Sequence, residues 1–258
     1  MKIGVLIKQV PDTATQFKVK SDGSSVETAG IKWDIGPYDK FALEAALRIK
    51  ERLKAGQVIA VSLGEDRCIE SLIVALAVGA DRAIQICSDL AEIDAFVTAR
   101  ALAGLARQEA FDLILCGKQA TDLDQNQVAQ YLAFALNIGC VTVVESIDIA
   151  DDQKRATVLR RISGGAKEKI QVSFPAILTC EKGLPDLRYT PLPGLMKAKK
   201  MPIEKRSARE LSGGAEPKIY YRNFRLPPQK QPGRILNGEP DQVVKELVRL
   251  LREEAKVI

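Results

Sequence analysis

Histidine is absent from the 258 residues of the sequence, so the side chain that most often acts as a general base near neutral pH is missing. Its absence excludes histidine-based catalytic triads and most transition-metal sites. An enzyme would have to use aspartate, lysine or cysteine instead. Chemistry at a site built from protein side chains alone is therefore less expected.

Paired cysteines are also lacking. The five cysteines are scattered and none forms a C-x-x-C motif, which argues against a structural zinc site or a disulfide framework. Cys87, Cys116 and Cys180 stand among isoleucine, leucine and threonine in strand-like runs, so we interpret them as small core residues. No metal site is expected.

Long apolar runs are missing as well, because none approaches the roughly 20 residues that span a bilayer. The apolar part of the N-terminus is too short for a signal peptide and continues into a strand pattern. These features predict an intracellular, cytoplasmic protein that does not insert into membranes. The net charge of +5 favours an acidic partner surface or an anionic ligand over nucleic acid.

Over its first two-thirds the sequence alternates short apolar runs with longer amphipathic ones. This alternation predicts an α/β fold, a parallel sheet with helices on both faces. The expected strands span 2–10, 57–63, 83–87, 112–116 and 141–144, and the expected helices span 39–54, 66–78, 93–108 and 125–137. Ligands of such sheets bind beyond the carboxyl ends of the strands, so the loops after Val10, Leu63 and Cys116 are candidate sites.

The pattern changes after Glu145. Residues 156–162 and 167–173 flank a Ser-Gly-Gly-Ala turn, which predicts a small hairpin, and one more strand is expected over 176–181.

Prolines recur from Gly183 onward, and few of these stretches suit the interior of a compact element. We predict a compact α/β domain over 1–183 and an extended arm over 184–258. The arm ends in an amphipathic helix over 241–255. Because it has little core of its own, we expect it to lie on a partner subunit.

The segment 117–127 lies between an expected strand and an expected helix, where free backbone N–H groups and the helix dipole suit a phosphate. Lys118 would add charge, and the amides of Asn126 and Gln127 would donate hydrogen bonds. The alternative is structural, with Asp124 simply capping the helix. A metal held by the aspartates of this loop is disfavoured, because no third ligand is evident nearby.

Two further segments, 36–39 and 196–200, are candidate binding sites. In 36–39, Pro37 fixes a turn and Asp39 can cap the following helix, while Tyr38 either stacks on a ligand ring or packs within the protein. The run 196–200 is amphipathic and basic, which is typical of a solvated surface helix. Nucleic-acid binding would call for interleaved aromatic residues, and this run has none.

Three strings combine into a family resemblance: GKQATDLDQNQ at 117–127, LRYTPLPGLMKAKK at 187–200, and RRISGGAKEK at 160–169 before SFPAILTCE. Together they resemble the beta subunit of electron-transfer flavoproteins. The resemblance runs in order along nearly the whole chain, from KQVPD at 8–12 to the tail at Pro227 and Pro228.

The resemblance implies a Rossmann-like domain, similar to adenine nucleotide alpha-hydrolases, that forms a heterodimer with an alpha subunit. Such beta subunits hold a structural AMP, while FAD lies mainly in the alpha subunit. The complex would carry electrons from flavoprotein dehydrogenases, such as acyl-CoA dehydrogenases, to a downstream acceptor, and this chain would perform no substrate chemistry of its own. The arm over 184–258 would then include the partner-recognition loop and wrap the alpha subunit.

The resemblance also implies site residues, position by position. The cofactor contacts would be Leu6, Gly36, Pro37, Tyr38, Asp39, Leu63, Gly117, Lys118, Gln119, Ala120, Thr121, Asp122, Leu123, Asp124, Gln125, Asn126, Gln127 and Val128, with Tyr38 toward the flavin. The segment 181–200 would dock onto dehydrogenases, with Leu192 as its anchor. Its docking residues would be Arg188, Tyr189, Leu192, Leu195, Met196, Lys197, Lys199 and Lys200.

Several positions depart from the family pattern. Arg161 and Ser163 stand where acidic residues are common, and Pro185-Asp186-Leu187 replaces Asn-Glu-Pro. Val128 and Ala129 replace Thr-Gly, which removes a hydroxyl that would reach the phosphate. These departures bear on the identity of the partner more than on the fold.

Two alternatives stay open. In an electron-bifurcating member the beta subunit binds a second FAD in place of AMP, but such members read Asp-Gly-Asp-Thr-Ala-Gln where this chain has residues 122–127 (DLDQNQ), so AMP is favoured. An ATP-using enzyme of the alpha-hydrolase type would need a pyrophosphate-binding Gly/Ser loop after the first strand, where residues 9–12 (QVPD) stand.

Overall fold

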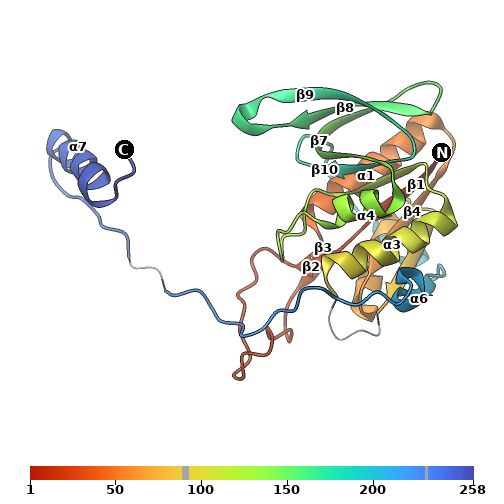
Figure 1. Cartoon of the computed structure of the whole chain (residues 1–258), viewed down its shortest axis with the longest axis horizontal. Helices are drawn as coiled ribbons and strands as arrows, with labels where there is room; N and C mark the ends of the chain where they lie inside the picture. The colour runs from red at the N-terminus through yellow and green to blue at the C-terminus, as the bar shows by residue number, and fades with distance from the viewer. Residues whose placement is uncertain (89–92, 230–231) are drawn as a thin grey trace. The chain divides into compact units, whose positions relative to one another are not determined.

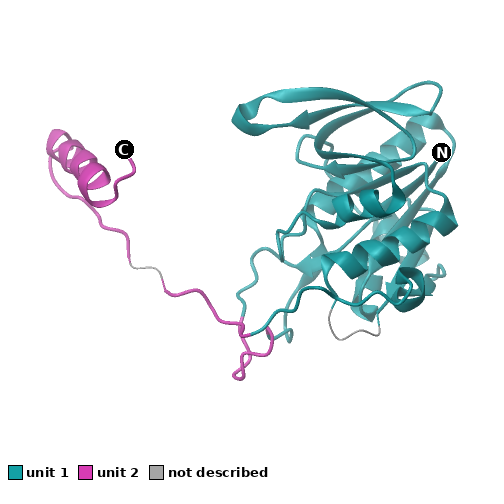
Figure 2. Ribbon diagram, viewed as in Figure 1, with its two compact units in different colours: residues 1–17, 27–222 teal, residues 18–26, 223–258 magenta. Residues whose placement is uncertain are grey.

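The computed structural model describes residues 1–88, 93–229 and 232–258, which form two compact units (Figure 2). The larger unit comprises residues 1–17 and 27–222, and the smaller unit comprises residues 18–26 and 223–258. The sheet and all helices that pack on it belong to the larger unit.

The larger unit is built on a nine-stranded sheet with the order β11-β5-β4-β1-β6-β10-β7-β8-β9 (Figure 1). Neighbouring strands from β11 to β7 run parallel, and the hairpin β8–β9 continues the sheet antiparallel. The strands are β1 (Lys2–Leu6), β4 (Gln57–Leu63), β5 (Arg82–Cys87), β6 (Leu113–Gly117), β7 (Gly139–Ile149), β8 (Arg155–Arg161), β9 (Lys167–Ser173), β10 (Ala176–Cys180) and β11 (Glu204–Ser207).

Helices cover both faces of this sheet because successive strand residues point to opposite sides. Val58 and Ala60 of β4 belong to the core that contains α1 and α2, whereas Ile59 and Val61 belong to the core that contains α3 and α4. The helices are α1 (Pro37–Leu53), α2 (Ile69–Val78), α3 (Ala95–Glu109), α4 (Val128–Leu136), α5 (Leu192–Ala198) and α6 (Ala208–Ser212). The α/β fold class expected from the sequence is confirmed.

The strand expected over 2–10 is divided. β1 ends at Leu6, and Gln9–Pro11 forms a separate strand, β2, that pairs antiparallel with β3 (Trp33–Ile35). The cause lies at Lys8, whose carbonyl accepts the N–H of Gly36 and whose N–H is bound by a carboxylate of the same turn. The turn therefore takes the backbone groups that a sheet neighbour would otherwise bind.

The helix expected from residue 125 begins at Val128. Asp124 and Asn126 have φ angles of 49° and 48°, in the left-handed region that a right-handed helix excludes. The loop after β6 is therefore longer than the sequence pattern indicates. The other expected helices and strands of the first two-thirds are present near their expected bounds, and the strand expected over 141–144 is longer.

Residues 184–222, which the prolines predict to be part of an extended arm, belong to the larger unit. This segment contains α5, β11 and α6, so the arm without helix or strand begins only after residue 212. β11 joins the sheet edge beside β5, and Ala198 of α5 and Ala208 of α6 are buried in the two cores. Small apolar residues at these points let α5 pack closely on α2 and α6 on α3. The functional division at residue 183 stays a prediction.

The smaller unit contains α7 (Pro240–Arg249), which continues as a π-helical turn over Leu250–Glu254. The helix expected over 241–255 is therefore present. Val244, Leu247 and Val248 on its apolar side are exposed. No helix among the described residues is long and apolar enough to cross a membrane.

Gly104 of α3 is the point at which α3 meets α6, and a Cβ there would lie 2.1 Å from the carbonyl oxygen of Leu211. Gly104→Ala should lower the free energy of unfolding by about 1–3 kcal/mol, because the two backbones must separate. In an exposed helix, replacing glycine by alanine raises the free energy of unfolding by about 1 kcal/mol. A loss of stability at Gly104 would therefore indicate that α6 packs directly against this position. Urea denaturation of the purified protein measures it.

The matched control is Gly64→Ala, because a Cβ at Gly64 would approach no atom closer than 3.8 Å. Its effect should stay within about 0.5 kcal/mol. Equal losses at both positions, or a gain at Gly104, would contradict the packing of α6 on α3.

Candidate functional site

Strands β4, β1 and β6 lie side by side at the centre of the sheet. The chain passes from β1 to β4 through α1, and from β5 to β6 through α3, which packs on the opposite face. This reversal leaves a crevice beyond the carboxyl ends of β1 and β6, where α/β sheets usually bind ligands. A cavity of about 430 Å³ lies there, within the range of about 300–1,000 Å³ typical of small-molecule sites.

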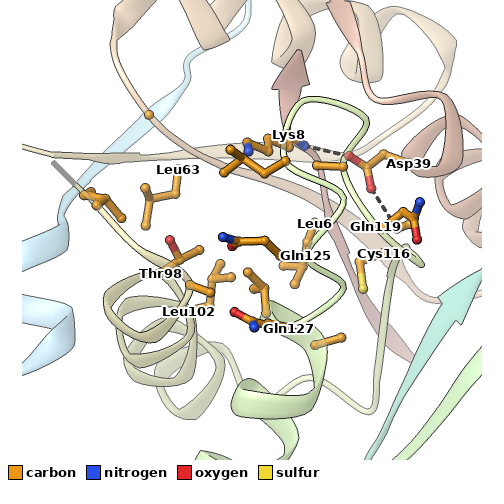
Figure 3. A pocket seen from close by; sticks show the side chains of 18 of the residues that line it. Leu6, Lys8, Asp39, Leu63, Thr98, Leu102, Cys116, Gln119, Gln125 and Gln127 are labelled. Carbon is orange, nitrogen blue, oxygen red and sulfur yellow. Dashed lines mark hydrogen bonds between the residues drawn. The ribbon is translucent and has the colours of Figure 1, made fainter. Parts of the chain in front are cut away.

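Strand ends, loops and helix starts line this cavity (Figure 3). Its lining residues are Leu6, Ile7, Lys8, Asp39, Val61, Leu63, Gly64, Glu65, Arg67, Ser88, Ile93, Asp94, Ala95, Thr98, Leu102, Cys116, Gly117, Lys118, Gln119, Ala120, Leu123, Gln125, Asn126, Gln127, Val128, Ala129 and Tyr221.

Asp39, in the first turn of α1, links the ends of β1 and β6. Its carboxylate accepts the N–H of Lys8 at 2.8 Å and the N–H of Gly117 at 2.7 Å (Figure 3). The side chain is buried, and burial raises the pKa of Asp39 to about 6 against the lowering effect of these two hydrogen bonds. Only glycine fits at position 117, because a Cβ there would lie 2.6 Å from the carboxylate.

The loop after β6 is held by hydrogen bonds among nearby side chains. Gln119 Nε2 donates to Asp124 Oδ1 at 2.9 Å, and Gln130 Nε2 donates to Asn126 Oδ1 at 3.0 Å. Asp124 therefore does not cap α4, whose N-cap position is Gln127. The Oε1 atom of Gln127 is buried and has no hydrogen-bond partner among the described residues. A donor from outside the chain would satisfy it.

Two cationic side chains stand on the β1 and β4 sides of the cavity. Lys8 Nζ lies 2.7 Å from Asp122 Oδ2, and both side chains are partly exposed. The Arg67 guanidinium stacks over Trp33, 3.7 Å from the ring centroid. Both cations line the cavity, which suits an anionic ligand.

Lys118 joins the cavity to the segment after β10. Its Nζ forms an ion pair with Oε2 of Glu181, a buried side chain, and lies 4.7 Å from the centroid of the Tyr38 ring. Burial lowers the pKa of Lys118, but the ion pair with Glu181 outweighs it and the pKa lies above its usual value. The cavity loop and the segment 181–200 therefore share a charged contact.

The sequence analysis missed one wall of the cavity. Asp94 caps α3 by accepting the N–H of Val97 at 2.8 Å, and its second oxygen accepts the N–H groups of Lys218 and Ile219 at 2.7 and 3.2 Å. These bonds hold the segment that carries Tyr221, a lining residue. An aspartate before an amphipathic helix is a recognisable capping signal, but no local pattern links it to residue 218.

Most of the predicted cofactor residues line the cavity: Leu6, Asp39, Leu63, Gly117, Lys118, Gln119, Ala120, Leu123, Gln125, Asn126, Gln127 and Val128. The others lie in the same two turns without lining it: Gly36, Pro37, Tyr38, Thr121, Asp122 and Asp124. Their contact with a cofactor stays a prediction.

The predicted docking residues differ in exposure. Tyr189, Leu192 and Met196 are 87%, 69% and 57% exposed, on α5 and in the turn before it. Leu192 is the first residue of α5, and prolines on either side of it fix the helix start. Leu195 and Arg188 are half-buried, and the exposed lysines are Lys197, Lys199 and Lys200.

Comparison with known proteins gives a consistent result. Residues 24–211 match the model of the electron transfer flavoprotein domain family. The chain is 39% identical to the electron transfer flavoprotein subunit beta of Bacillus subtilis, over the whole of both chains. It is 37% identical to the mitochondrial electron transfer flavoprotein subunit beta of Arabidopsis thaliana over the same share. The Bos taurus electron transfer flavoprotein subunit beta is 37% identical over 93% of this chain and 94% of its own.

The raised pKa of Asp39 makes the stability of the chain depend on pH. The folded protein keeps a proton on this carboxyl up to about pH 6, whereas the usual value is 3.8. Its contribution to stability is therefore full below the unfolded pKa and is lost as pH rises through the folded pKa. Asp39→Asn removes this titration. Between about pH 4 and 6, the unfolding free energy of the wild type should fall relative to that of the variant, as urea denaturation at a series of pH values will measure.

Glu65→Gln is the control, because Glu65 also lines the cavity but its side chain is 79% exposed. Its effect on the free energy of unfolding should stay within about 0.5 kcal/mol, as expected for a surface substitution. A constant difference between wild type and Asp39→Asn over the same pH range would show that Asp39 titrates like an ordinary carboxyl.

Proposed function

The chain belongs to the family of electron transfer flavoprotein beta subunits, and we propose that it holds a structural AMP in the cavity beyond β1, β4 and β6. Proteins of this family carry electrons as heterodimers of a beta and an alpha subunit. The observation that carries the proposal is the cavity at the reversal point of the sheet, with the unpaired Gln127 Oε1 among its walls.

The cavity supplies three features that AMP requires. Leu63 and Leu102 give apolar walls for a purine, and Gln127 Oε1 is an acceptor for its exocyclic amino group (Figure 3). Lys8 and Arg67 give positive charge for a phosphate. AMP bound in this way would fill and brace the loops without taking part in electron transfer.

FAD is proposed to lie mainly in the alpha subunit and to approach this chain on the side of Tyr38. When bound, the flavin supplies the redox chemistry of the complex. Tyr38 is partly exposed, and its ring faces Lys118 at 4.7 Å.

The ATP-using alternative gains no support from the segment that it depends on. Residues Gln9–Pro11, which follow the first strand, form β2 and pair with β3. They leave no glycine-rich loop for a pyrophosphate at that position. Electron bifurcation, with a second FAD in the same cavity, is the alternative that the first experiment tests.

We further propose that the segment 181–200 docks onto flavoprotein dehydrogenases such as acyl-CoA dehydrogenases. Its exposed Tyr189, Leu192 and Met196 would enter an apolar pocket, and the neighbouring lysines would steer toward an acidic surface. The smaller unit, with the exposed apolar side of α7, is proposed to lie on the alpha subunit.

The heterodimer, obtained by co-expression with the alpha-subunit gene, should release one FAD and one AMP on denaturation, as quantitative chromatography will measure. Two FAD and no AMP would overturn the AMP proposal and favour bifurcation. Gln127→Leu should lower the affinity for AMP about fivefold or more, because a buried hydrogen bond is lost. Gln108→Leu, exposed near the far end of α3, is the control and should leave AMP content unchanged.

Leu192→Ala should slow electron transfer from the dehydrogenase by about ten- to a hundredfold, because burying one leucine is worth about 1.5–3 kcal/mol. FAD content and melting temperature should barely change. Phe134→Ala, at an apolar residue that is 88% exposed on α4, is the control. A lower melting temperature with unchanged dehydrogenase kinetics would mean that Leu192 packs inside the heterodimer instead.

A further inference from the structure

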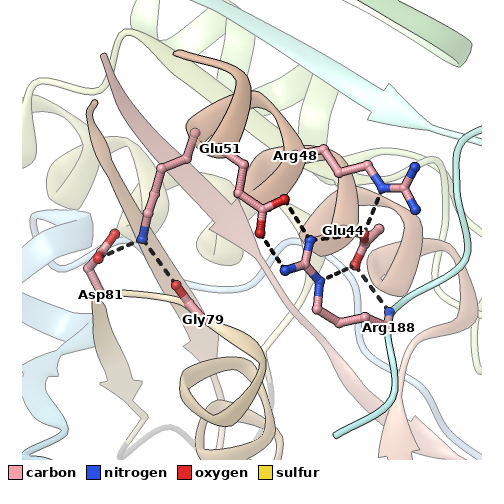
Figure 4. A network of polar contacts seen from close by, with 7 residues as sticks. Glu44, Arg48, Glu51, Gly79, Asp81 and Arg188 are labelled. Carbon is pink, nitrogen blue, oxygen red and sulfur yellow. Dashed lines mark hydrogen bonds and ion pairs between the residues drawn. The ribbon is translucent and has the colours of Figure 1, made fainter. Parts of the chain in front are cut away.

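Arg188 ties the middle of the segment 181–200 to helix α1 (Figure 4). Its backbone N–H, Nε and Nη2 donate to the carboxylate of Glu44 at 3.1, 3.0 and 3.1 Å. Nη1 and Nη2 also donate to Glu51 at 2.5 and 3.1 Å. One guanidinium thus bridges two carboxylates that lie two turns apart on the same helix.

The ion pair between Arg188 and Glu44 is costly to break, because the Glu44 side chain is only 1% exposed. Burial alone would raise the pKa of Glu44, but hydrogen bonds from Arg188 and Arg48 outweigh it and hold the pKa below its usual value. Arg48 Nε bonds to one oxygen at 2.7 Å, and Arg188 supplies the remaining donors. Removing Arg188 would leave a buried carboxylate short of partners.

The exposed docking residues follow Arg188 directly. Tyr189 is the next residue, and Leu192 lies four positions on, at the start of α5. The far end is fixed as well, because Gly194 sits so close to α2 that a Cβ would lie 2.9 Å from the carbonyl oxygen of Ala77. Between these two anchors the backbone has few conformations to lose when a partner binds.

We propose that Arg188 is a positioning residue, which holds Tyr189 and Leu192 in the conformation that docks, and that its guanidinium does not itself bind the dehydrogenase. The inference rests on the proposed docking function of the segment 181–200. It differs from the sequence-based expectation that Arg188 is itself a docking contact, because the positive charge is already paired with Glu44 and Glu51.

Glu51→Gln separates positioning from direct contact, because the two roles predict opposite effects. The Glu51 side chain is 55% exposed, so the variant should fold normally. If Arg188 positions the segment, the loss of one of its two partners loosens Tyr189 and Leu192 and weakens docking. If Arg188 bound an acidic partner directly, the same variant would free its charge and strengthen docking.

The experiment uses the heterodimer with an acyl-CoA dehydrogenase from the same organism as electron donor. Glu51→Gln and Arg188→Lys should each raise the KM for the heterodimer about three- to tenfold with unchanged kcat, as expected for the cost of ordering a few side chains. Glu70→Gln, another exposed helical glutamate, is the charge-matched control and should leave KM unchanged. An unchanged or lower KM for Glu51→Gln would overturn the inference.

Hydrogen exchange and a second variant separate this inference from the docking proposal. Amides of residues 186–191 should exchange faster in the Glu51→Gln heterodimer without any dehydrogenase present, and unchanged exchange would overturn the positioning role. If Leu192→Ala raises KM and Glu51→Gln does not, docking stands and the inference falls. If neither variant changes KM, the docking function itself is wrong, and the positioning inference falls with it.

Discussion

A carboxylate that is withdrawn from water must be met by hydrogen-bond donors, and this requirement fixes the loops of the chain that surround the candidate sites. The described residues include five buried carboxylates, those of Asp39, Glu44, Asp94, Glu145 and Glu181. Each binds a segment other than its own element. Asp39 joins the ends of β1 and β6, Asp94 joins α3 to residue 218, and Glu181 joins the end of β10 to the cavity loop.

The same requirement explains a departure from the family pattern. Arg161, which replaces an acidic residue, forms an ion pair with Glu145 of β7, and Lys167 lies 2.7 Å from the same carboxylate. The Glu145 side chain is only 4% exposed, whereas those of Arg161 and Lys167 are 49% and 53% exposed, so these cations tie the turn end of the hairpin β8–β9 to a buried carboxylate of β7. Arg161 is thus paired within the chain.

Sequence patterns predicted the elements because each depends on local periodicity, and β4 has the bounds that its apolar run indicates. They also indicated the edge of the sheet that holds the cavity, because parallel strands end together there. Sequence patterns cannot predict the partners of the buried carboxylates, because those partners are distant in the sequence. Glu44 and Arg188 are 144 residues apart, and Asp94 and Lys218 are 124 residues apart. A sequence displays the charge of Arg188 but not the carboxylates that neutralise it, so the sequence alone predicts a surface contact at this residue.

These internal pairs also decide which charges remain for a partner. Arg188, Lys118 and Arg161 are neutralised by buried carboxylates, so they contribute little to the field outside the chain. Among the ion pairs of the described residues, none involves the lysines at 197, 199 and 200, which are exposed on and just after α5. Three positive charges without an ion-pair partner among the described residues therefore follow Leu192 closely in the sequence, and under the proposed docking function their field would steer an acidic surface before apolar contact begins. Under the same proposal, Arg188 would fix the shape of the segment 181–200, and these lysines would raise the rate at which a partner finds it.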